Sequence, residues 1–154
     1  MKRFILLAAV LITSICIFAG CNSKDEPSSM VSESLKSIEE IQTLIEGETD
    51  AERIQSFLGY IKNEQLSEML SDGVKLNLLE RNGKLVYVIK DPDLAEDSIQ
   101  RYQDFLKTEY TSSQYEAVAN ILLGMGVKRP FVVVEYVDNK GEVLATAEYR
   151  ATDF

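Results

Sequence analysis

The sequence of 154 residues contains no histidine and no tryptophan, and its only cysteines are Cys16 and Cys21. Histidine is the commonest general base and the commonest ligand of transition metals in proteins. Its absence excludes Ser-His-Asp and Cys-His catalysis. The usual zinc sites, built from four cysteines, from cysteine with histidine or from three histidines, cannot be assembled from these residues either. An enzyme with this composition would depend on paired carboxylates, on lysine or tyrosine bases, or on a metal bound through oxygen.

The N-terminus has the layout of a secretory signal peptide. Lys2 and Arg3 form a short basic region, residues 4–18 are apolar except for a Thr-Ser pair, and the small residues Ala19 and Gly20 follow. This order is typical of export signals. The apolar run of about 15 residues is shorter than the roughly 20 that span a bilayer comfortably. A permanent signal-anchor helix remains the alternative.

The end of this run, "FAGC" at residues 18–21, resembles the lipobox of bacterial lipoprotein precursors. It departs from the usual pattern at Phe18, where leucine is most common. The resemblance implies that residues 1–20 are removed and that the sulfur of Cys21 carries diacylglycerol, with the new N-terminus open to acylation by a chain such as palmitate. Two or three acyl chains hold a protein stably on a membrane. An ordinary signal peptide with an incidental cysteine at the cleavage site is the alternative.

The charge balance bears on the partners of the mature chain. The full sequence has 16 basic and 25 acidic residues, for a net charge of -9. Because residues 1–20 contain two bases and no acid, the mature chain keeps 14 bases and 25 acids, or -11. Such a chain repels phosphate backbones, so we expect no nucleic-acid partner. The excess acid also argues against docking on anionic lipid through a basic patch.

We divide the mature chain into a flexible tether at residues 21–29 and a single folded domain at residues 30–154. The tether, "CNSKDEPSS", is polar after Cys21, and its proline and serines are typical of a spacer. In the domain, apolar residues at helical spacing predict one helix that Gly47 ends. "TDAE" at residues 49–52 is a capping box that predicts the start of a second helix, which continues toward Gly73 with a change of phase near residues 62–63.

Strand signals follow. Residues 74–90 alternate between apolar and polar on either side of Asn82-Gly83, which is the strongest short signal for a hairpin. "DPD" at residues 91–93 stops the strand and opens a helix. Residues 94–125 predict either one long helix or two helices joined at residues 111–113. A second hairpin, "FVVVEYV" and "EVLATAEYR" around "DNKG", ends the chain.

These elements predict an α+β domain with helices on one face of a four-stranded, mostly antiparallel sheet. The expected order is helix, helix, strand, strand, a long or divided helix, strand, strand. Each half of this order runs helix, "GVK", strand, turn, strand, with "GVK" at residues 73–75 and 126–128. A true internal repeat and a coincidental three-residue match both remain open.

Two longer motifs, "NGKLVYVIK" and "GVKRPFVVVEYVDNKGEVLATAEY", give the domain a further resemblance. Together with the acidic break and long helix between them, they are similar to the C-terminal domain of small lipoproteins found mainly in Gram-positive bacteria, especially clostridia. The resemblance covers about residues 50–150. It implies lipidation and an α+β fold, and because that family has no assigned function it supplies no catalytic residue.

Two clusters of acids are candidates for chemistry. "DPDLAED" carries Asp91, Asp93, Glu96 and Asp97, which could serve as oxygen ligands for calcium, although it lacks the glycine and ligand spacing of an EF-hand loop. We interpret it as a helix N-terminus in which acids cap the backbone. "EGETDAE" carries the second cluster, Glu46, Glu48, Asp50 and Glu52. A glycosidase needs two carboxylates facing each other across a cleft, and we interpret this cluster as a solvated junction between helices.

Aromatic and basic residues offer two further candidates. The mature chain holds seven tyrosines, which could form an exposed platform for a peptide or glycan but whose spacing favours core positions. "VKRPF" at residues 127–131 is the most basic stretch and could contact phosphate groups. We interpret it as a solvated turn before a strand.

The sequence therefore predicts a lipoprotein anchored by Cys21 on the extracytoplasmic face of the cell membrane. Its domain is best interpreted as a non-enzymatic binding module for an envelope protein or a cell-wall ligand, with no catalytic, metal-binding or cofactor-binding residues. A carboxylate-dependent cell-wall hydrolase and an accessory or inhibitory subunit of an envelope complex are the alternatives.

Overall fold

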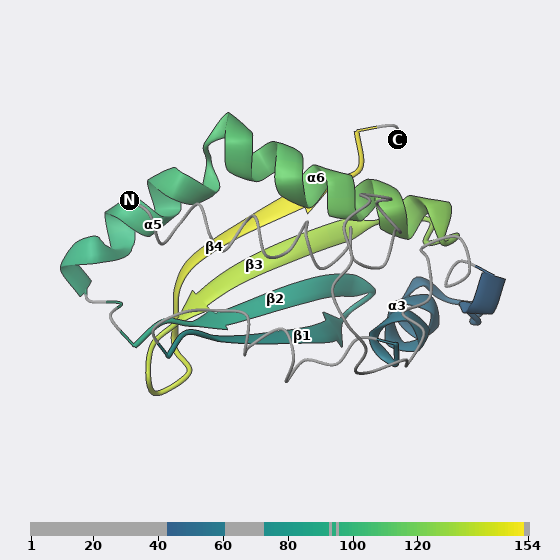
Figure 1. Ribbon diagram of the computed structural model, residues 1–154, viewed down its shortest axis with the longest axis horizontal. Helices are drawn as coiled ribbons and strands as arrows, with labels where there is room; N and C mark the ends of the chain where they lie inside the picture. Colours follow the sequence, from purple (N-terminus) through teal and green to yellow (C-terminus); the bar gives the residue numbers. More distant parts are fainter. Residues whose placement is uncertain (1–42, 61–72, 93, 95, 153–154) are drawn as a thin grey trace, which may run out of the picture.

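A computed structural model of the protein describes residues 43–60, 73–92, 94 and 96–152. The predicted signal peptide, Cys21, the tether, most of the first helix and residues 61–72 lie outside the described residues. The described elements, in chain order, are α3 (Asp50–Leu58), β1 (Lys75–Arg81), β2 (Lys84–Lys90), the short 3-10 helix η1 (Glu96–Ser98), α5 (Ile99–Leu106), α6 (Glu109–Gly124), β3 (Phe131–Val137) and β4 (Val143–Arg150). These elements confirm the predicted α+β class (Figure 1).

The four strands form one sheet in the order β1-β2-β3-β4. The two hairpins, β1–β2 and β3–β4, are antiparallel, but the central pair β2–β3 is parallel, with Leu85 opposite Val132. A parallel pair needs a crossover that carries the chain back along the sheet, and α5 and α6 supply it. The expected antiparallel pattern therefore holds within each hairpin and not between them.

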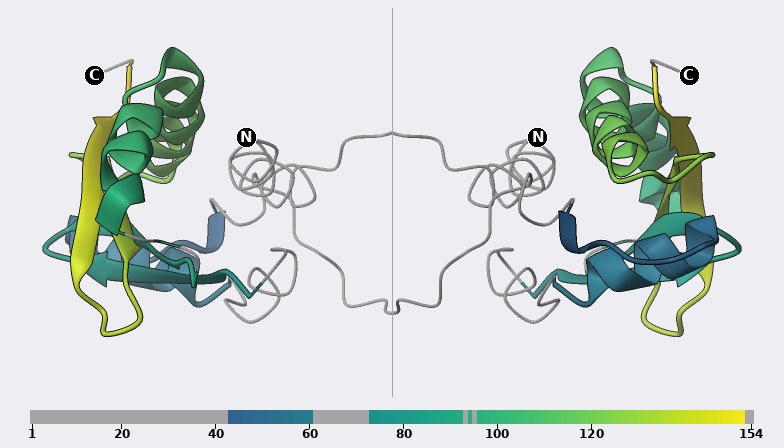
Figure 2. Two further views of the ribbon diagram at one scale, coloured as in Figure 1. Left: turned by 90° about the vertical axis from the view of Figure 1, so that its left-hand side faces the viewer. Right: turned by 90° about the vertical axis from the view of Figure 1, so that its right-hand side faces the viewer.

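The core lies on one face of the sheet, which we call the inner face. Alternate strand residues point to this face, including Leu78, Tyr87, Val134 and Tyr149. Helix α3 packs over β1 and β2, while α5 and α6 pack over β3 and β4 (Figure 2). Among the described helices, none is long and apolar enough to cross a bilayer.

The first hairpin turns at Asn82-Gly83, as the sequence predicts. Asn82 has φ of 55° and Gly83 has φ of 76°, so both central residues are in the left-handed region. This conformation defines the turn whose twist matches that of the flanking strands, and glycine adopts it without steric cost. The second hairpin closes around Asp138, whose carboxylate accepts hydrogen bonds from the backbone N–H groups of Lys140 and Glu142, both at 2.8 Å.

The helical stretch of residues 94–125 is divided, and the break lies at residues 107–108. The predicted joint at residues 111–113 is wrong, because Thr111 and its neighbours form the first turn of α6. Thr108 is the N-cap: its ψ of 145° is extended and its hydroxyl accepts from the Thr111 N–H at 3.3 Å. Short hydroxyl side chains favour such positions over helix interiors, so the polar run marks a helix start.

The two halves of the chain are not superimposable repeats. Because β1 is antiparallel to β2 and β2 is parallel to β3, the first strands of the two hairpins run in opposite directions. A rotation of the second hairpin by 180° about the normal to the sheet makes β3 run in the same direction as β1. After this rotation, β4 lies on one side of β3, whereas β2 lies on the other side of β1. Because the described helices all lie on the inner face, the two halves have opposite handedness. The "GVK" stretches also differ in position, because Lys75 begins β1 whereas Lys128 precedes β3.

The predicted capping box is present at the start of α3. The Thr49 hydroxyl accepts from the Glu52 N–H at 3.2 Å, and the Glu52 carboxylate accepts from the N–H groups of Thr49 at 3.0 Å and Glu48 at 2.8 Å. The backbone N–H of Thr49, then that of Glu48, holds the pKa of Glu52 below its usual value. This is the reciprocal arrangement expected of the motif.

Replacing Glu52 with glutamine should lower the melting temperature at pH 7, and the difference from wild type should shrink as the pH falls. The depressed folded-state pKa means that the charged carboxylate stabilises the fold above the unfolded value of about 4.3. That contribution is lost as the pH drops through the folded-state pKa. Thermal unfolding followed by circular dichroism at pH 7 and pH 3 measures it. Glu48→Gln, which removes the same charge from an exposed side chain, should have no such pH-dependent effect; equal behaviour of the two variants would contradict the assignment.

Candidate functional site

Among the described residues, the N-cap of α5 is not one of the acids that follow β2, although Glu96 and Asp97 belong to η1, the short helical turn directly before α5. Asp91 is buried and accepts a hydrogen bond from the Tyr102 hydroxyl at 2.7 Å. The N-cap of α5 is Ser98, which makes no side-chain capping bond. Asp97 is exposed and accepts from the Ser98 hydroxyl at 3.2 Å, while Asp93 lies outside the described residues. The hydrogen bond between Asp91 and Tyr102 therefore connects the segment directly after β2 with helix α5 inside the core.

No group of three or more acidic side chains in the described parts of the chain is arranged to hold a metal ion. The acids before and within α3 do not converge either. Glu46 and Glu48 are exposed, Glu52 closes the capping box, and Asp50 points to a different part of the chain. The interpretation as a solvated junction thus fits three of these four residues and misses the role of Asp50.

Asp50 ties α3 to the turn that precedes β3. One carboxylate oxygen accepts from the backbone N–H of Lys128 at 2.8 Å, and the other accepts from that of Arg129 at 3.0 Å. These two residues belong to the "VKRPF" stretch, and they lie almost eighty positions from Asp50 in the sequence. Hydrogen bonds from two N–H groups to one carboxylate are charge-assisted. They fix the position from which the Arg129 side chain departs.

A pocket of about 200 Å³ lies where α3, the β1–β2 turn and the start of β3 meet. Its lining combines two basic side chains, one carboxylate, one aromatic ring and the tip of the hairpin: Asp50, Asn82, Gly83, Lys84, Arg129 and Phe131. The ammonium of Lys84 lies 5.1 Å from the centre of the Phe131 ring, in cation–π contact. Two stretches that the sequence presents as separate turns, "NGK" and "VKRPF", thus form one site.

The pocket opens beside a row of residues on the outer face of the sheet, the face opposite to the helices. In the strand register, Arg81 on β1 lies opposite Lys84 on β2, and Phe131 on β3 lies opposite Arg150 on β4. These four residues lie at the same end of the sheet, one on each strand. We call Arg81, Lys84, Arg129 and Arg150 the cationic rim. Among the described residues, Arg129 and Arg150 have no ion-pair partner.

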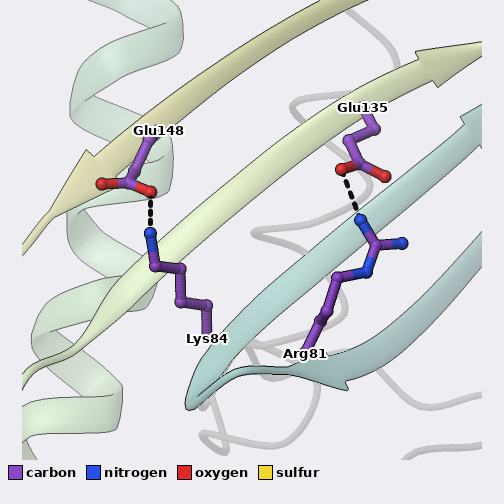
Figure 3. Close-up of polar contacts among 4 residues, drawn as sticks. All are labelled: Arg81, Lys84, Glu135 and Glu148. Atoms are coloured by element: carbon purple, nitrogen blue, oxygen red, sulfur yellow. Dashed lines mark hydrogen bonds and ion pairs between the residues drawn. The ribbon is translucent and has the colours of Figure 1, made fainter. Parts of the chain in front are cut away.

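Two ion pairs cross the outer face from this row (Figure 3). Arg81 on β1 reaches over β2 to Glu135 on β3, with Nη1 and Oε1 2.6 Å apart, and Lys84 on β2 reaches over β3 to Glu148 on β4. By register, the first pair passes over Val86, which is only 2% exposed although it points away from the core. The charged side chains therefore shield the apolar centre of this face.

The outer face is positively charged, in contrast to the chain as a whole. By strand alternation it carries five bases and two acids: Lys75, Arg81, Lys84, Lys90, Arg150, Glu135 and Glu148. The full sequence has 16 bases and 25 acids. An acidic protein therefore presents one basic surface, which the overall composition does not reveal.

The tyrosines do not form an exposed platform in the described parts of the chain. Five of them belong to the core, as their spacing predicts: Tyr87, Tyr102, Tyr115, Tyr136 and Tyr149. The Tyr115 ring stacks on Tyr149 with centroids 5.0 Å apart and meets the edge of Tyr87 at 5.4 Å. Burial raises the pKa of Tyr115 and of Tyr87 above the usual value. These hydroxyls stay protonated near neutral pH, so they are poor candidates for catalytic bases.

Comparisons with protein-family models, with curated proteins and with solved structures find no match to this chain. The site geometry and the sequence motifs are therefore the basis for assigning a function. The predicted resemblance to small Gram-positive lipoproteins stays a prediction.

Proposed function

We propose that this protein is a lipoprotein held on the extracytoplasmic face of the cell membrane by Cys21, and that its folded domain acts by binding a ligand. The observation that carries the anchor is the sequence "FAGC" directly after an apolar run with a basic start. The sharp change to polar residues after Cys21 supports a tether that separates the membrane from the domain.

The pocket beside the cationic rim supports binding over catalysis as the activity of the domain. Hydrolysis by a carboxylate pair requires two acids that face the same bond. Among the residues that line the pocket, Asp50 is the one carboxylate. Both of its oxygens accept backbone hydrogen bonds, so its geometry serves the position of the turn. Two basic side chains and a ring around a small hollow favour recognition of an anionic group.

Cys21→Ala should abolish metabolic labelling with a palmitate analogue and release the protein from the membrane fraction. Cys16→Ala provides a matched control, because Cys16 lies inside the segment that we expect to be discarded. This control should be labelled as strongly as wild type. Labelling is measured on the immunoprecipitated protein after cell fractionation. Equal labelling of wild type and Cys21→Ala would contradict the anchor.

Crosslinking on intact membranes tests the binding role and its alternatives. A ligand-binding domain should be crosslinked to envelope material reproducibly, and variants of the pocket should lose that material. Recovery of one protein partner that is independent of the pocket would favour an accessory subunit of an envelope complex. Release of soluble fragments from purified cell wall, lost in Asp50→Asn, would favour the hydrolase.

A further inference from the structure

The cationic rim is built to receive more than one negative charge. Lys84 and Arg129 line the pocket, and Arg81 and Arg150 lie at the ends of β1 and β4 in the same row. Adjacent strands are about 4.8 Å apart, so the row from β1 to β4 spans about 14 Å. A single small anion in the pocket cannot contact both ends of this row.

We propose that the rim binds a linear, anionic polymer whose repeating groups are phosphodiesters. The excess of bases on the outer face opposes the repulsion that the net charge of -9 predicts for the chain as a whole. This inference rests on the proposed function, since it names the ligand class of the same site. One phosphate would occupy the pocket between Lys84 and Arg129. Neighbouring phosphates along the chain would contact Arg81 on one side and Arg150 on the other.

The chemistry of the pocket favours phosphate over carboxylate. Lys84 comes from β2 and Arg129 from the turn before β3, so the two cations approach the hollow from different segments. A tetrahedral phosphate presents oxygens in several directions, and the arginine fork suits phosphate in a bidentate manner. The uncharged part of each repeat would lie on Phe131 and on the backbone of Gly83, which line the same pocket.

The partners that the rim cations already have do not block this role. The side chains of Lys84 and Glu148 are 36% and 43% exposed. The side chain of Arg81 is 49% exposed, but that of its partner Glu135 is only 11% exposed. An ion pair exposed on both sides contributes little to stability, so Lys84 can exchange the carboxylate of Glu148 for a phosphate at low cost. Arg81 keeps its pair with the buried Glu135 and contacts a phosphate through its other N–H groups. Asp50 keeps its negative charge, but both of its oxygens accept hydrogen bonds from backbone N–H groups, whose partial positive charges offset part of its repulsion of the ligand.

A linear polymer fits the site better than a bilayer surface does. The apolar centre of the outer face is shielded by the two ion pairs, with Val86 only 2% exposed, so it offers little to insert among lipids. A bilayer is an extended plane of negative charge that would also approach the acidic remainder of the domain. A narrow chain needs contact only with the rim.

Fluorescence anisotropy with a short glycerol phosphate oligomer, joined by phosphodiester bonds and labelled with fluorescein, tests this inference on the full chain in neutral detergent. Arg129→Gln and Arg150→Gln should each raise the Kd about tenfold, because each removes one charge-assisted contact. Lys140→Gln makes the same charge change in the exposed turn at the opposite end of β3 and should leave the Kd unchanged. Circular dichroism checks that each variant is folded.

Several results would overturn the inference. Absence of binding, or equal Kd values for the rim variants and Lys140→Gln, would remove the rim as a polymer site. Equally tight, rim-dependent binding of polyglutamate would reassign the ligand to a carboxylate polymer. Rim-dependent sedimentation with phosphatidylglycerol vesicles, without binding of the oligomer, would assign the rim to lipid. The Cys21 labelling experiment is independent of all these measurements, so failure of the anchor and failure of the rim are distinguishable.

Discussion

Leu122→Ala should lower the free energy of unfolding by about 2–5 kcal/mol, the range found when a fully buried leucine is truncated. Leu122 lies on α6 and is fully buried in the core. Its own carbonyl accepts backbone bonds from Met125 and Val127 that the substitution does not remove. The loss therefore reports side-chain packing of the crossover helix on the sheet.

Urea denaturation measures this effect, and Leu123→Ala is the matched control. Leu123 is the next residue of the same helix and is only partly buried against the core. The same chemical change should therefore destabilise the protein much less there. If the two variants lost equal stability, the face that α6 presents to the sheet would be assigned wrongly.

Asp50→Ala should have the second largest effect, a loss of about 1–3 kcal/mol of unfolding free energy, since hydrogen bonds to charged groups contribute more than neutral ones. The substitution removes both acceptors of the Lys128 and Arg129 N–H groups. It also removes an acid from the first turn of α3, where negative charge is favourable. Helix α3 would lose these two bonds to the turn before β3 and would keep the hydrogen bond from Arg53 to the Met125 carbonyl, at 3.4 Å.

Amide hydrogen exchange separates this role from a general loss of stability. In Asp50→Ala the amides of Lys128 and Arg129 should exchange faster than those of β3, whereas a global effect would accelerate all of them together. Glu48→Ala removes an exposed acid two residues earlier and should change neither stability nor these amides. Unchanged protection at Lys128 and Arg129 in Asp50→Ala would show that the carboxylate does not hold the turn.

The sequence predicts the local parts of this fold well because their signals are local. Asn82-Gly83 determines its own turn through left-handed backbone conformations, and "TDAE" closes its own capping box. The parallel pairing of β2 with β3 could not be predicted in this way. Alternation tells which face of a strand is buried, but not which strand lies beside it. That choice depends on how the two helices of the crossover pack on the sheet.

The candidate site shows the same limit. "NGK" and "VKRPF" each predict a solvated turn, and each is a turn, but the sequence gives no sign that they meet. Their contact depends on the parallel central pair, which brings the beginnings of β2 and β3 to the same end of the sheet. The sequence predicts Asp50 as an acid in the first turn of α3. Its hydrogen bonds to distant residues follow only from the tertiary fold.

The basic outer face could be anticipated only in part. Once the strands are assigned, alternation places all of their charged residues except Glu80 on one side, whereas the total charge of -9 suggests a uniformly acidic surface. The strand order is also needed to predict the two ion pairs, from Arg81 to Glu135 and from Lys84 to Glu148, each of which passes over one intervening strand.

The parallel central pair also has a consequence for the folding kinetics. Each hairpin joins neighbouring segments and can form within microseconds. The β2–β3 pair joins Leu85 to Val132 and has to close a long loop that contains α5 and α6. Loop closure of this kind slows folding. We therefore expect docking of the two preformed hairpins, guided by the crossover helices, to limit the folding rate.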